Sequence, residues 1–348
     1  MKNSYKHRFI NDYSELAHPD VINALAAVGT RQFEGYGLDE FSFRARDLIK
    51  TRIGNHAADV HFIGGGTHAN LVVLSSILRP HEAAIAPRSG HIFVHETGAI
   101  EATGHKVCTV DGHNGKITAD EIDSVVAEHT DEHMVKPRAV YISQATEDGT
   151  VYNKAELSAI SQCCRRNGLY LFLDGARIGT AINGAACDLT LSDITGFVDV
   201  FYIGGTKNGA LFGEAIVICN DDLKPDFRFH LKQKGALIAK GAVIGLQFEA
   251  LMRNGLFDKL AKHACTTACK LADGITKAGY DILYPVDANM VFPILPAPVV
   301  EKLHSLYSFH DWEKLGDMTA VRFVISWATP EKAVDELLDD LHMIASNQ

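Results

Sequence analysis

The sequence predicts an α/β fold: a mainly parallel sheet covered by helices, followed by a smaller C-terminal α+β domain. Between about residues 50 and 220, short continuous apolar runs alternate with helical patterns, which is typical of a parallel sheet with both faces covered. After about residue 250, one long helical pattern leads to two apolar strand-like runs and a final amphipathic helix. A chain of 348 residues is long enough for two domains, which we place at residues 1–255 and 256–348.

The individual elements follow from apolar residues at helical spacing and from short apolar runs bounded by polar or small residues. In chain order we expect a helix at 68–78, a strand at 83–87, a helix at 118–129, a strand at 136–143, a helix at 154–167 that ends at Gly168, and a strand at 169–174. Two more strands, at 200–203 and 215–218, enclose a segment of small residues and Lys207. In the C-terminal domain we expect a helix at 257–278, strands at 288–295 and 321–327, and a helix at 330–345.

Composition and charge exclude several classes of protein. A formal charge of −10 argues against a general nucleic-acid or membrane-surface binder. No apolar run is long enough to span a bilayer, and the first ten residues lack the apolar region of a signal peptide. The seven cysteines form no CxxC pair or disulfide pattern, so we expect a reducing, cytoplasmic compartment.

Three polar features fall where ligands bind in parallel α/β sheets, outside the carboxyl ends of the strands. Asp174 ends one predicted strand, Lys207 follows another, and "GGGT" (64–67) directly precedes a helix. Each feature also has a plainer interpretation. Asp174 is a suitable helix cap, Lys207 a suitable solvated loop residue, and glycines occur in many tight turns for steric reasons.

Taken together, the three features indicate pyridoxal phosphate. A glycine-rich turn at a helix N-terminus suits its phosphate, a lysine amine forms a Schiff base with its aldehyde, and a carboxylate partners its ring nitrogen. A dinucleotide-dependent oxidoreductase is an alternative class, but the GxGxxG fingerprint fits poorly and leaves Lys207 without a role. A non-catalytic ligand-binding protein is a further alternative.

The chain resembles the threonine aldolases, in the aspartate-aminotransferase-like (fold type I) group of pyridoxal-phosphate enzymes, whose sheet is of the seven-stranded type. The resemblance covers nearly the whole chain, and "DGAR" followed by "GGTKNG" is its most specific combination. The motifs that carry it are "YGLDEF" (36–41), "GGGTHANL" (64–71), "SGHIFVHETGA" (89–99), "SQATEDGTVY" (143–152), "LDGARIG" (173–179), "GGTKNG" (204–209), "ANMVF" (288–292) and "VRFVISW" (321–327).

The resemblance implies roles for the cofactor's neighbours. Lys207 forms the Schiff base, Asp174 pairs with the ring nitrogen, and His91 stacks on the ring. The phosphate is held by Gly66, Thr67 and Thr206. His91 and His95 at i, i+4 also invite a metal interpretation, but the HxxxHE pattern is not a zinc motif and offers no third ligand. We therefore expect no metal.

The resemblance also implies the substrate contacts. Arg177, which also borders the cofactor, and Arg322 grip the substrate carboxylate, where a guanidinium fork allows bidentate contact. Tyr36 borders the site near a subunit contact. Many family members have a serine near the N-terminus where this chain has "INDYS" (10–14), so Asn11 or Ser14 is its replacement. A family histidine near Glu147 is also missing, which leaves His91 or Glu147 as the base.

The activity implied by the resemblance is retro-aldol cleavage of L-threonine or L-allo-threonine to glycine and acetaldehyde, by a lyase. The alternative on the same scaffold is β-elimination, because the fold does not choose which bond breaks. The substrate is a small amino acid. The resemblance further implies a homodimer or homotetramer with the active site at the subunit interface.

Overall fold

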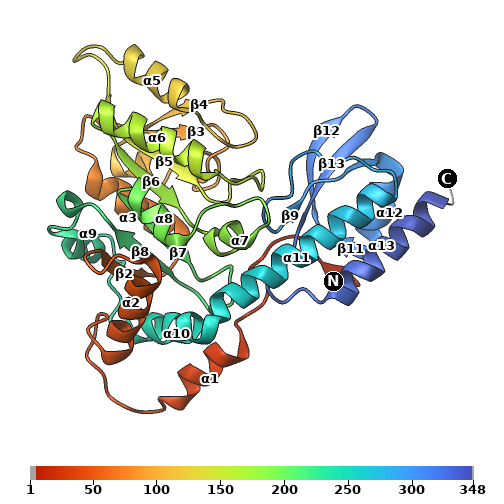
Figure 1. Cartoon of the computed structure of the whole chain (residues 1–348), viewed down its shortest axis with the longest axis horizontal. Helices are drawn as coiled ribbons and strands as arrows, with labels where there is room; N and C mark the ends of the chain where they lie inside the picture. The colour runs from red at the N-terminus through yellow and green to blue at the C-terminus, as the bar shows by residue number, and fades with distance from the viewer. Residues whose placement is uncertain (1–4, 347–348) are drawn as a thin grey trace.

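The computed structural model describes residues 5–346, so the outermost residues of the two predicted domains, 1–4 and 347–348, lie outside it. A large unit built on a seven-stranded sheet is joined to a C-terminal unit by the long helix α11 (Leu256–Lys277), as Figure 1 shows. Within residues 5–346, no helix combines the length and apolar character needed to cross a membrane.

The large sheet is mainly parallel, as predicted. Its strand order is β2-β8-β7-β6-β5-β3-β4, and only β8 runs antiparallel to its neighbours. The short connection at residues 205–213 explains this reversal, because a parallel crossover needs about a dozen residues or more. The strands are β2 (Asp59–Ile63), β3 (Glu82–Pro87), β4 (Lys106–Val110), β5 (Lys136–Ser143), β6 (Tyr170–Asp174), β7 (Val200–Gly204) and β8 (Glu214–Ile218).

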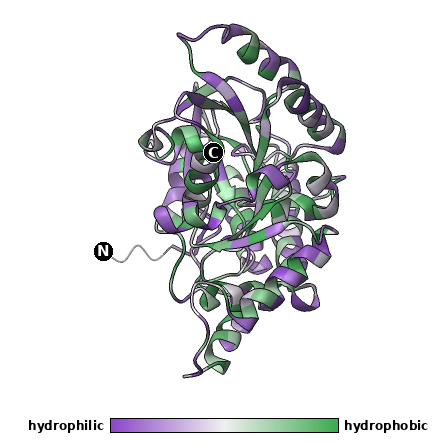
Figure 2. Ribbon diagram, turned by 90° about the vertical axis from the view of Figure 1, so that its left-hand side faces the viewer, coloured by the Kyte–Doolittle hydropathy of each residue, from purple (hydrophilic) through white to green (hydrophobic). Residues whose placement is uncertain are grey.

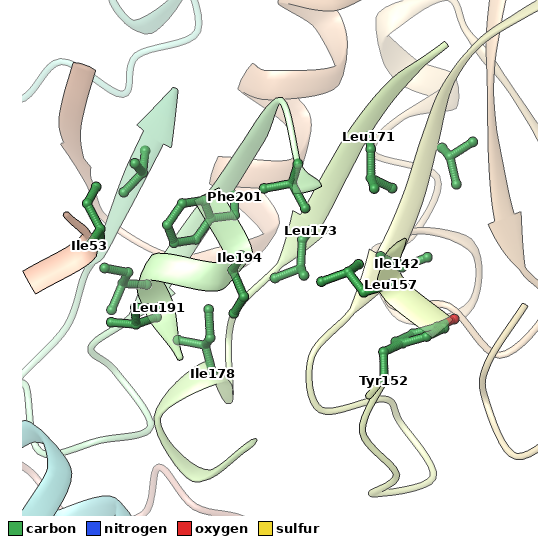
Figure 3. Packing of buried hydrophobic residues seen from close by; sticks show 14 of the residues in the cluster. Ile53, Ile142, Tyr152, Leu157, Leu171, Leu173, Ile178, Leu191, Ile194 and Phe201 are labelled. Atoms are coloured by element: carbon green, nitrogen blue, oxygen red, sulfur yellow. The ribbon is translucent and has the colours of Figure 1, made fainter. Parts of the chain in front are cut away.

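Helices cover both faces of this sheet, and alternate strand residues point into two separate cores. Val140 and Ile142 belong to the core under α2 (Glu40–Ile53), α5 (Ala119–Glu128), α6 (Lys154–Asn167) and α8 (Leu191–Phe197), part of which Figure 3 shows. Ala139 and Tyr141 belong to the opposite core under α3 (Gly66–Ile77) and α9 (Phe227–Gln233). Figure 2 shows hydrophobic residues gathered along the central strands, with hydrophilic stretches on the surrounding helices.

Local capping explains where the predicted helices begin and end. Asn153 and Glu156 form a capping box at the start of α6, and Gly168 ends it in the left-handed conformation, so the predicted range 154–167 is confirmed. Helix α3 begins at Gly66, two residues before the range predicted from its apolar pattern, because the glycine turn itself enters the helix. The remaining helices of the large unit are α1 (Pro19–Ala27), α4 (His91–Val94), α7 (Ile178–Asn183) and α10 (Ala242–Met252).

The C-terminal unit is a small antiparallel sheet packed on helices. Strand β13 (Met318–Val324) lies between β10 (Ile294–Pro296) and β12 (His310–Leu315) and also pairs with β9 (Met290–Val291). Helices α12 (Ala297–Leu306) and α13 (Glu331–Ser346) complete it.

The first described residues lie with this C-terminal unit rather than with the large sheet. Strand β1 (His7–Arg8) pairs in parallel with β11 (Tyr307–Ser308), and Phe9 is buried in the same core as Val321 and Phe323. The division at residues 255 and 256 coincides with the start of α11 and stays a prediction.

Candidate active site

A cavity of about 400 Å³ lies at the edge of the large sheet where β2, β5, β6 and β7 end and the antiparallel β8 begins. Connections from these strands therefore supply its walls, as expected for an α/β sheet. The cavity brings together eight predicted site residues, namely Gly66, Thr67, His91, Glu147, Asp174, Arg177, Thr206 and Lys207.

Glycines let the ends of β6 and β7 approach closely beneath this cavity. A Cβ atom at Gly175 would lie 1.8 Å from the carbonyl oxygen of Tyr202, and one at Gly204 would lie 2.3 Å from that of Ala176. The glycine of "DGAR" and the first glycine of "GGTKNG" are thus required by backbone packing. Their close approach places Lys207 beside Asp174.

Lys207 is partly buried and lines the cavity. Burial, followed by the positive charge of Arg177, lowers the pKa of Lys207. A lowered pKa increases the fraction of neutral amine, which is the form that attacks an aldehyde.

Asp174 is buried and fully hydrogen-bonded at the end of β6. Its carboxylate accepts hydrogen bonds from Tyr202 Oη, from Tyr141 Oη at 2.7 Å, from Asn70 Nδ2 at 3.0 Å and from the backbone N–H of Ala176 at 2.9 Å. Burial, followed by the Asp174 charge, raises the pKa of both tyrosines well above the usual value, so both remain donors. These four donors fix a carboxylate in place.

The glycine turn leaves open space at the start of α3. Nothing lies within 4 Å of a Cβ placed at Gly64 or Gly65, and the first N–H groups of α3 lack helical partners. This cradle, with the amine of Lys207 nearby in the same cavity, suits a phosphate. Thr206 Oγ1 also lines the cavity, but its hydrogen is donated to Glu214 Oε1 at 2.8 Å.

Glu147 and His91 line the same cavity and contact each other. The carboxylate oxygen Oε1 of Glu147 accepts from the backbone N–H of His91 and from Ser143 Oγ, each at 3.0 Å, whereas Oε2 is buried without a hydrogen-bond partner among the described residues. Burial, followed by the charge of Asp174, raises the pKa of Glu147 to about 7. Glu147 can therefore exchange a proton near neutral pH.

The two predicted substrate-binding arginines have different surroundings. Arg177 donates from Nε and Nη2 to the buried carboxylate of Asp12, at 2.7 and 3.0 Å. Although burial opposes ionisation, the charges of Arg177 and Lys207 lower the pKa of Asp12. The bidentate fork of Arg177 is thus occupied by Asp12, which leaves its remaining Nη1 group for a ligand.

Arg322 lies on β13 and is not among the residues that line the cavity. Its guanidinium lies 5.0 Å from the ring centre of Trp312, and its buried Nε has no hydrogen-bond partner in the described part of the chain. Burial, followed by the charge of Arg177, lowers the pKa of Arg322. The positive charge of Arg177 therefore acts on Arg322 electrostatically. The Nε–H of Arg322 is a hydrogen-bond donor that no described residue uses.

Two further predicted residues do not line the cavity. Asn11 Oδ1 accepts from the backbone N–H of Tyr13 at 3.0 Å and from Ser14 Oγ at 2.9 Å, so its side chain stabilises a turn. Tyr36 is exposed in a left-handed turn, with Lys232 Nζ 4.6 Å from its ring centre. Neither residue contacts the cavity from within its own chain.

Sequence reasoning missed Asp12, Tyr13, Tyr202 and Glu214. Asp12 stands next to the predicted Asn11, but nothing local indicates its pairing with Arg177, which is 165 positions away. Glu214 is the first residue of the apolar strand β8. An acidic residue at the start of a buried strand is a sequence signal that could have identified it as a candidate site residue. Burial raises the pKa of Glu214 to about 7.

The residues present fit pyridoxal phosphate. The cavity combines an amine with a lowered pKa, a carboxylate fixed by four donors and a glycine cradle at a helix N-terminus, which match the aldehyde, ring nitrogen and phosphate of this cofactor. The rings of His91 and His95 lie 5.5 Å apart, and residues 5–346 contain no group of three or more His, Cys, Asp or Glu side chains placed to hold a metal ion.

Comparison with known proteins identifies the family of this chain. The profile of the β-eliminating lyase family matches residues 19–297. The low specificity L-threonine aldolase of Pseudomonas aeruginosa is 33% identical over 341 residues, which cover 96% of each chain. The solved structure of Leishmania major threonine aldolase superimposes with a TM-score of 0.96 at 45% identity, covering 97% of this chain and 99% of that one.

A more distant structure supports the fold alone. Thermus thermophilus aspartate aminotransferase has a TM-score of 0.73 at 14% identity and covers 98% of this chain and 91% of its own. The predicted aspartate-aminotransferase-like fold and the predicted family are confirmed. The chain belongs to the β-eliminating lyase family, the pyridoxal-phosphate-dependent lyases that include the threonine aldolases.

Proposed function

We propose that this chain cleaves L-threonine and L-allo-threonine to glycine and acetaldehyde by a retro-aldol reaction. The observation that carries the proposal is the convergence of Lys207, Asp174 and the turn at 64–67 in one cavity of a chain related to L-threonine aldolases. When bound, pyridoxal phosphate supplies the electron sink for the pair left at the substrate's Cα. Lys207 would hold the cofactor's aldehyde carbon, Asp174 its ring nitrogen, and Gly66 and Thr67 its phosphate.

The protein side chains orient the substrate and move its protons. Arg177, through Nη1, binds the substrate carboxylate, and Arg322, which lies outside the cavity but close enough for its charge to interact with that of Arg177, adds a second positive charge for the same anion. His91 or Glu147 accepts the proton of the β-hydroxyl, directly or through water, while the Cα–Cβ bond breaks. A proton returned to Cα completes glycine. Tyr202 and Ser143, which also line the cavity, are buried.

Product analysis tests this activity against β-elimination. We expect the purified protein with added pyridoxal phosphate to release equimolar acetaldehyde and glycine from L-threonine. Pyruvate and ammonia from L-serine, without acetaldehyde from L-threonine, would instead identify a β-eliminating enzyme.

We also propose that the protein is a homodimer or homotetramer with its active site at the subunit interface. Helix α1 projects beside α10 at the rim of the large unit (Figure 1), and a cavity of about 620 Å³ lies between α1, α2 and α10. Large apolar side chains are exposed around this region and on the neighbouring face, namely Leu16, Ile22, Leu38, Phe43 and Phe229. Such a surface supports association with a second copy, which would bring Tyr36 to a partner's site.

Light scattering after size-exclusion chromatography tests this assembly. We expect a mass of two or four chains, and a single-chain mass that retains full activity would contradict it.

We place the protein in the cytoplasm because its seven cysteines are all free in the structure. Cell fractionation checks this location.

A further inference from the structure

A buried carboxylate, Glu96, holds the ring of His91 from the side away from the cavity. Glu96 Oε1 lies 2.8 Å from His91 Nδ1, and the exposed fractions of the two side chains are 0% and 35% respectively. His91 lines the cavity and Glu96 does not. The histidine therefore stands between a fully buried carboxylate and the space where substrate binds.

This contact determines which nitrogen of His91 carries hydrogen. An ionised carboxylate only accepts hydrogen bonds, so Nδ1 must carry the hydrogen that joins the two groups. In a neutral imidazole the other nitrogen, Nε2, then keeps its lone pair. Since Nδ1 is turned towards Glu96, Nε2 is the nitrogen available to the cavity.

Glu96 is itself fixed by a second contact that leads to Asp174. Asn70 Nδ2 donates one hydrogen to Glu96 Oε1 at 2.7 Å and the other to Asp174 Oδ2 at 3.0 Å. Both atoms of this amide group are buried, so the link cannot be replaced by bulk water. The carboxylate beside the histidine and the carboxylate that would pair with the cofactor's ring nitrogen are thus held by one amide.

A purely structural role explains Glu96 poorly. Its second oxygen, Oε2, and Asn70 Oδ1 are buried without hydrogen-bond partners in the part of the chain that the structure describes. An incompletely bonded buried carboxylate destabilises a fold, and an apolar side chain of similar size would pack at lower cost. A carboxylate at this position is better explained by its effect on His91.

We propose that Glu96 is the positioning residue for His91: it keeps the hydrogen on Nδ1, so that Nε2 accepts the β-hydroxyl proton. The inference rests on the proposed retro-aldol activity. In that step the O–H bond of the substrate breaks, an N–H bond forms at Nε2, the Cα–Cβ pair stays with the glycine fragment, and the oxygen becomes the carbonyl of the aldehyde. Glu96 stabilises the imidazolium that results.

Other charged groups around His91 do not replace Glu96. Glu147 accepts from the backbone N–H of His91, not from its ring, and His95 faces the ring at 5.5 Å between centres. Lys207 shares the cavity. Of these groups, only Glu96 contacts Nδ1.

Kinetics of two Glu96 variants test the proposal. Glu96→Gln keeps an acceptor without the charge, and Glu96→Leu removes both. We expect kcat/KM for L-threonine to fall roughly 10-fold in the first and roughly 100-fold in the second. The affinity for glycine should stay within about twofold, because glycine has no β-hydroxyl proton to transfer. Exposed Glu101→Gln, in the same segment, is the matched control and should match wild type.

Histidine ¹⁵N spectra give a readout that does not depend on turnover, with the His91 signals identified by their absence in His91→Asn. We expect the hydrogen of neutral His91 on Nδ1 in wild type and loss of this preference in Glu96→Leu. If that variant does not fold, the wild-type spectrum alone still shows which ring nitrogen carries the hydrogen. Hydrogen on Nε2 in wild type, or a Glu96→Leu enzyme with unchanged kcat/KM, would overturn the proposal. A wild-type protein that releases no acetaldehyde overturns the proposed function instead, whatever the spectra show.

Discussion

Asp174, which is buried, and Glu147, which is partly buried, are two carboxylates near the ends of neighbouring strands, with opposite surroundings. Ser143, at the end of β5, pairs with Asp174 in the sheet, and Glu147 follows it by four residues. Asp174 accepts four hydrogen bonds, shared between both oxygens, whereas within residues 5–346 Glu147 accepts two on one oxygen and none on the other. One sheet edge thus holds a carboxylate fixed by four donors beside a group that can exchange a proton.

This difference follows from the donors that each strand presents. Tyr141 and Tyr202 lie on strands adjacent to β6, and both point their hydroxyl groups at Asp174. Among the residues that the structure describes, no comparable pair of hydroxyl groups faces Glu147, and burial and the Asp174 charge raise its pKa to about 7. Substitutions at the two carboxylates should therefore have effects of different size and different pH dependence.

The largest effect is expected from Asp174→Asn. The change removes the carboxylate that would pair with the cofactor's ring nitrogen but keeps the size of the side chain. We expect kcat to fall by roughly 100- to 1000-fold at every pH, with weaker retention of the cofactor, measured by steady-state kinetics and visible absorbance. Activity within a few-fold of wild type would contradict a role for Asp174 in holding the cofactor's ring nitrogen.

Glu147→Gln should have a smaller effect that depends on pH. Ionised Glu147 stabilises positive charge on the neighbouring His91, and its raised pKa means that this form appears as pH passes through about 7. Wild-type kcat/KM should therefore rise across this range. We expect the variant to lose about 10-fold at pH 8 and to lack this rise. An unchanged pH profile would show that Glu147 does not titrate during turnover.

Asp12→Asn tests a third carboxylate of the site, the one that binds Arg177. The variant loses the charge that holds the fork of Arg177, so the guanidinium is less well fixed for a substrate carboxylate. We expect KM for L-threonine to rise about 10-fold with a smaller change in kcat. A fall in kcat at constant KM would indicate a role for Asp12 in the chemical step instead.

The smallest effect on activity, but a measurable one on stability, is expected from Glu214→Gln. The pKa of Glu214 is raised from 4.5 to about 7 in the folded protein, so its contribution to stability is present below pH 4.5 and lost as pH rises through 7. Between pH 5 and pH 8, the free energy of unfolding should fall by about 2.5 kcal/mol more in wild type than in the variant. Urea unfolding at both pH values measures this, with exposed Glu128→Gln as control.

Elements with strong local signals were predictable from the sequence. Strand β5 and helix α6 lie at the predicted residues, because proline, a capping box and Gly168 mark their ends. Strand β12 was missed because its side chains are mostly exposed and polar, which leaves no apolar pattern. The pairing of β1 with β11 joins residues about 300 positions apart, and no local pattern indicates such a contact.

The same distinction applies to the site. Lys207, Asp174 and the glycine turn could be placed together because ligand-binding residues follow strand ends in parallel sheets. The orientation of β8, which brings Glu214 to the same edge, depends on a short connection rather than on composition. The pairing of Asp12 with Arg177, and the contact of Glu96 with His91, depend on side-chain positions that only the folded chain defines.

The central claim, that Lys207 holds the cofactor, can be tested directly by borohydride reduction of the holoenzyme followed by digestion and mass spectrometry. We expect the visible absorbance of the bound cofactor to disappear and the pyridoxyl mass to be found on the peptide that contains Lys207, with no such peptide in Lys207→Ala. A label on another lysine, such as Lys232, or none on a protein that still cleaves L-threonine, would contradict the account.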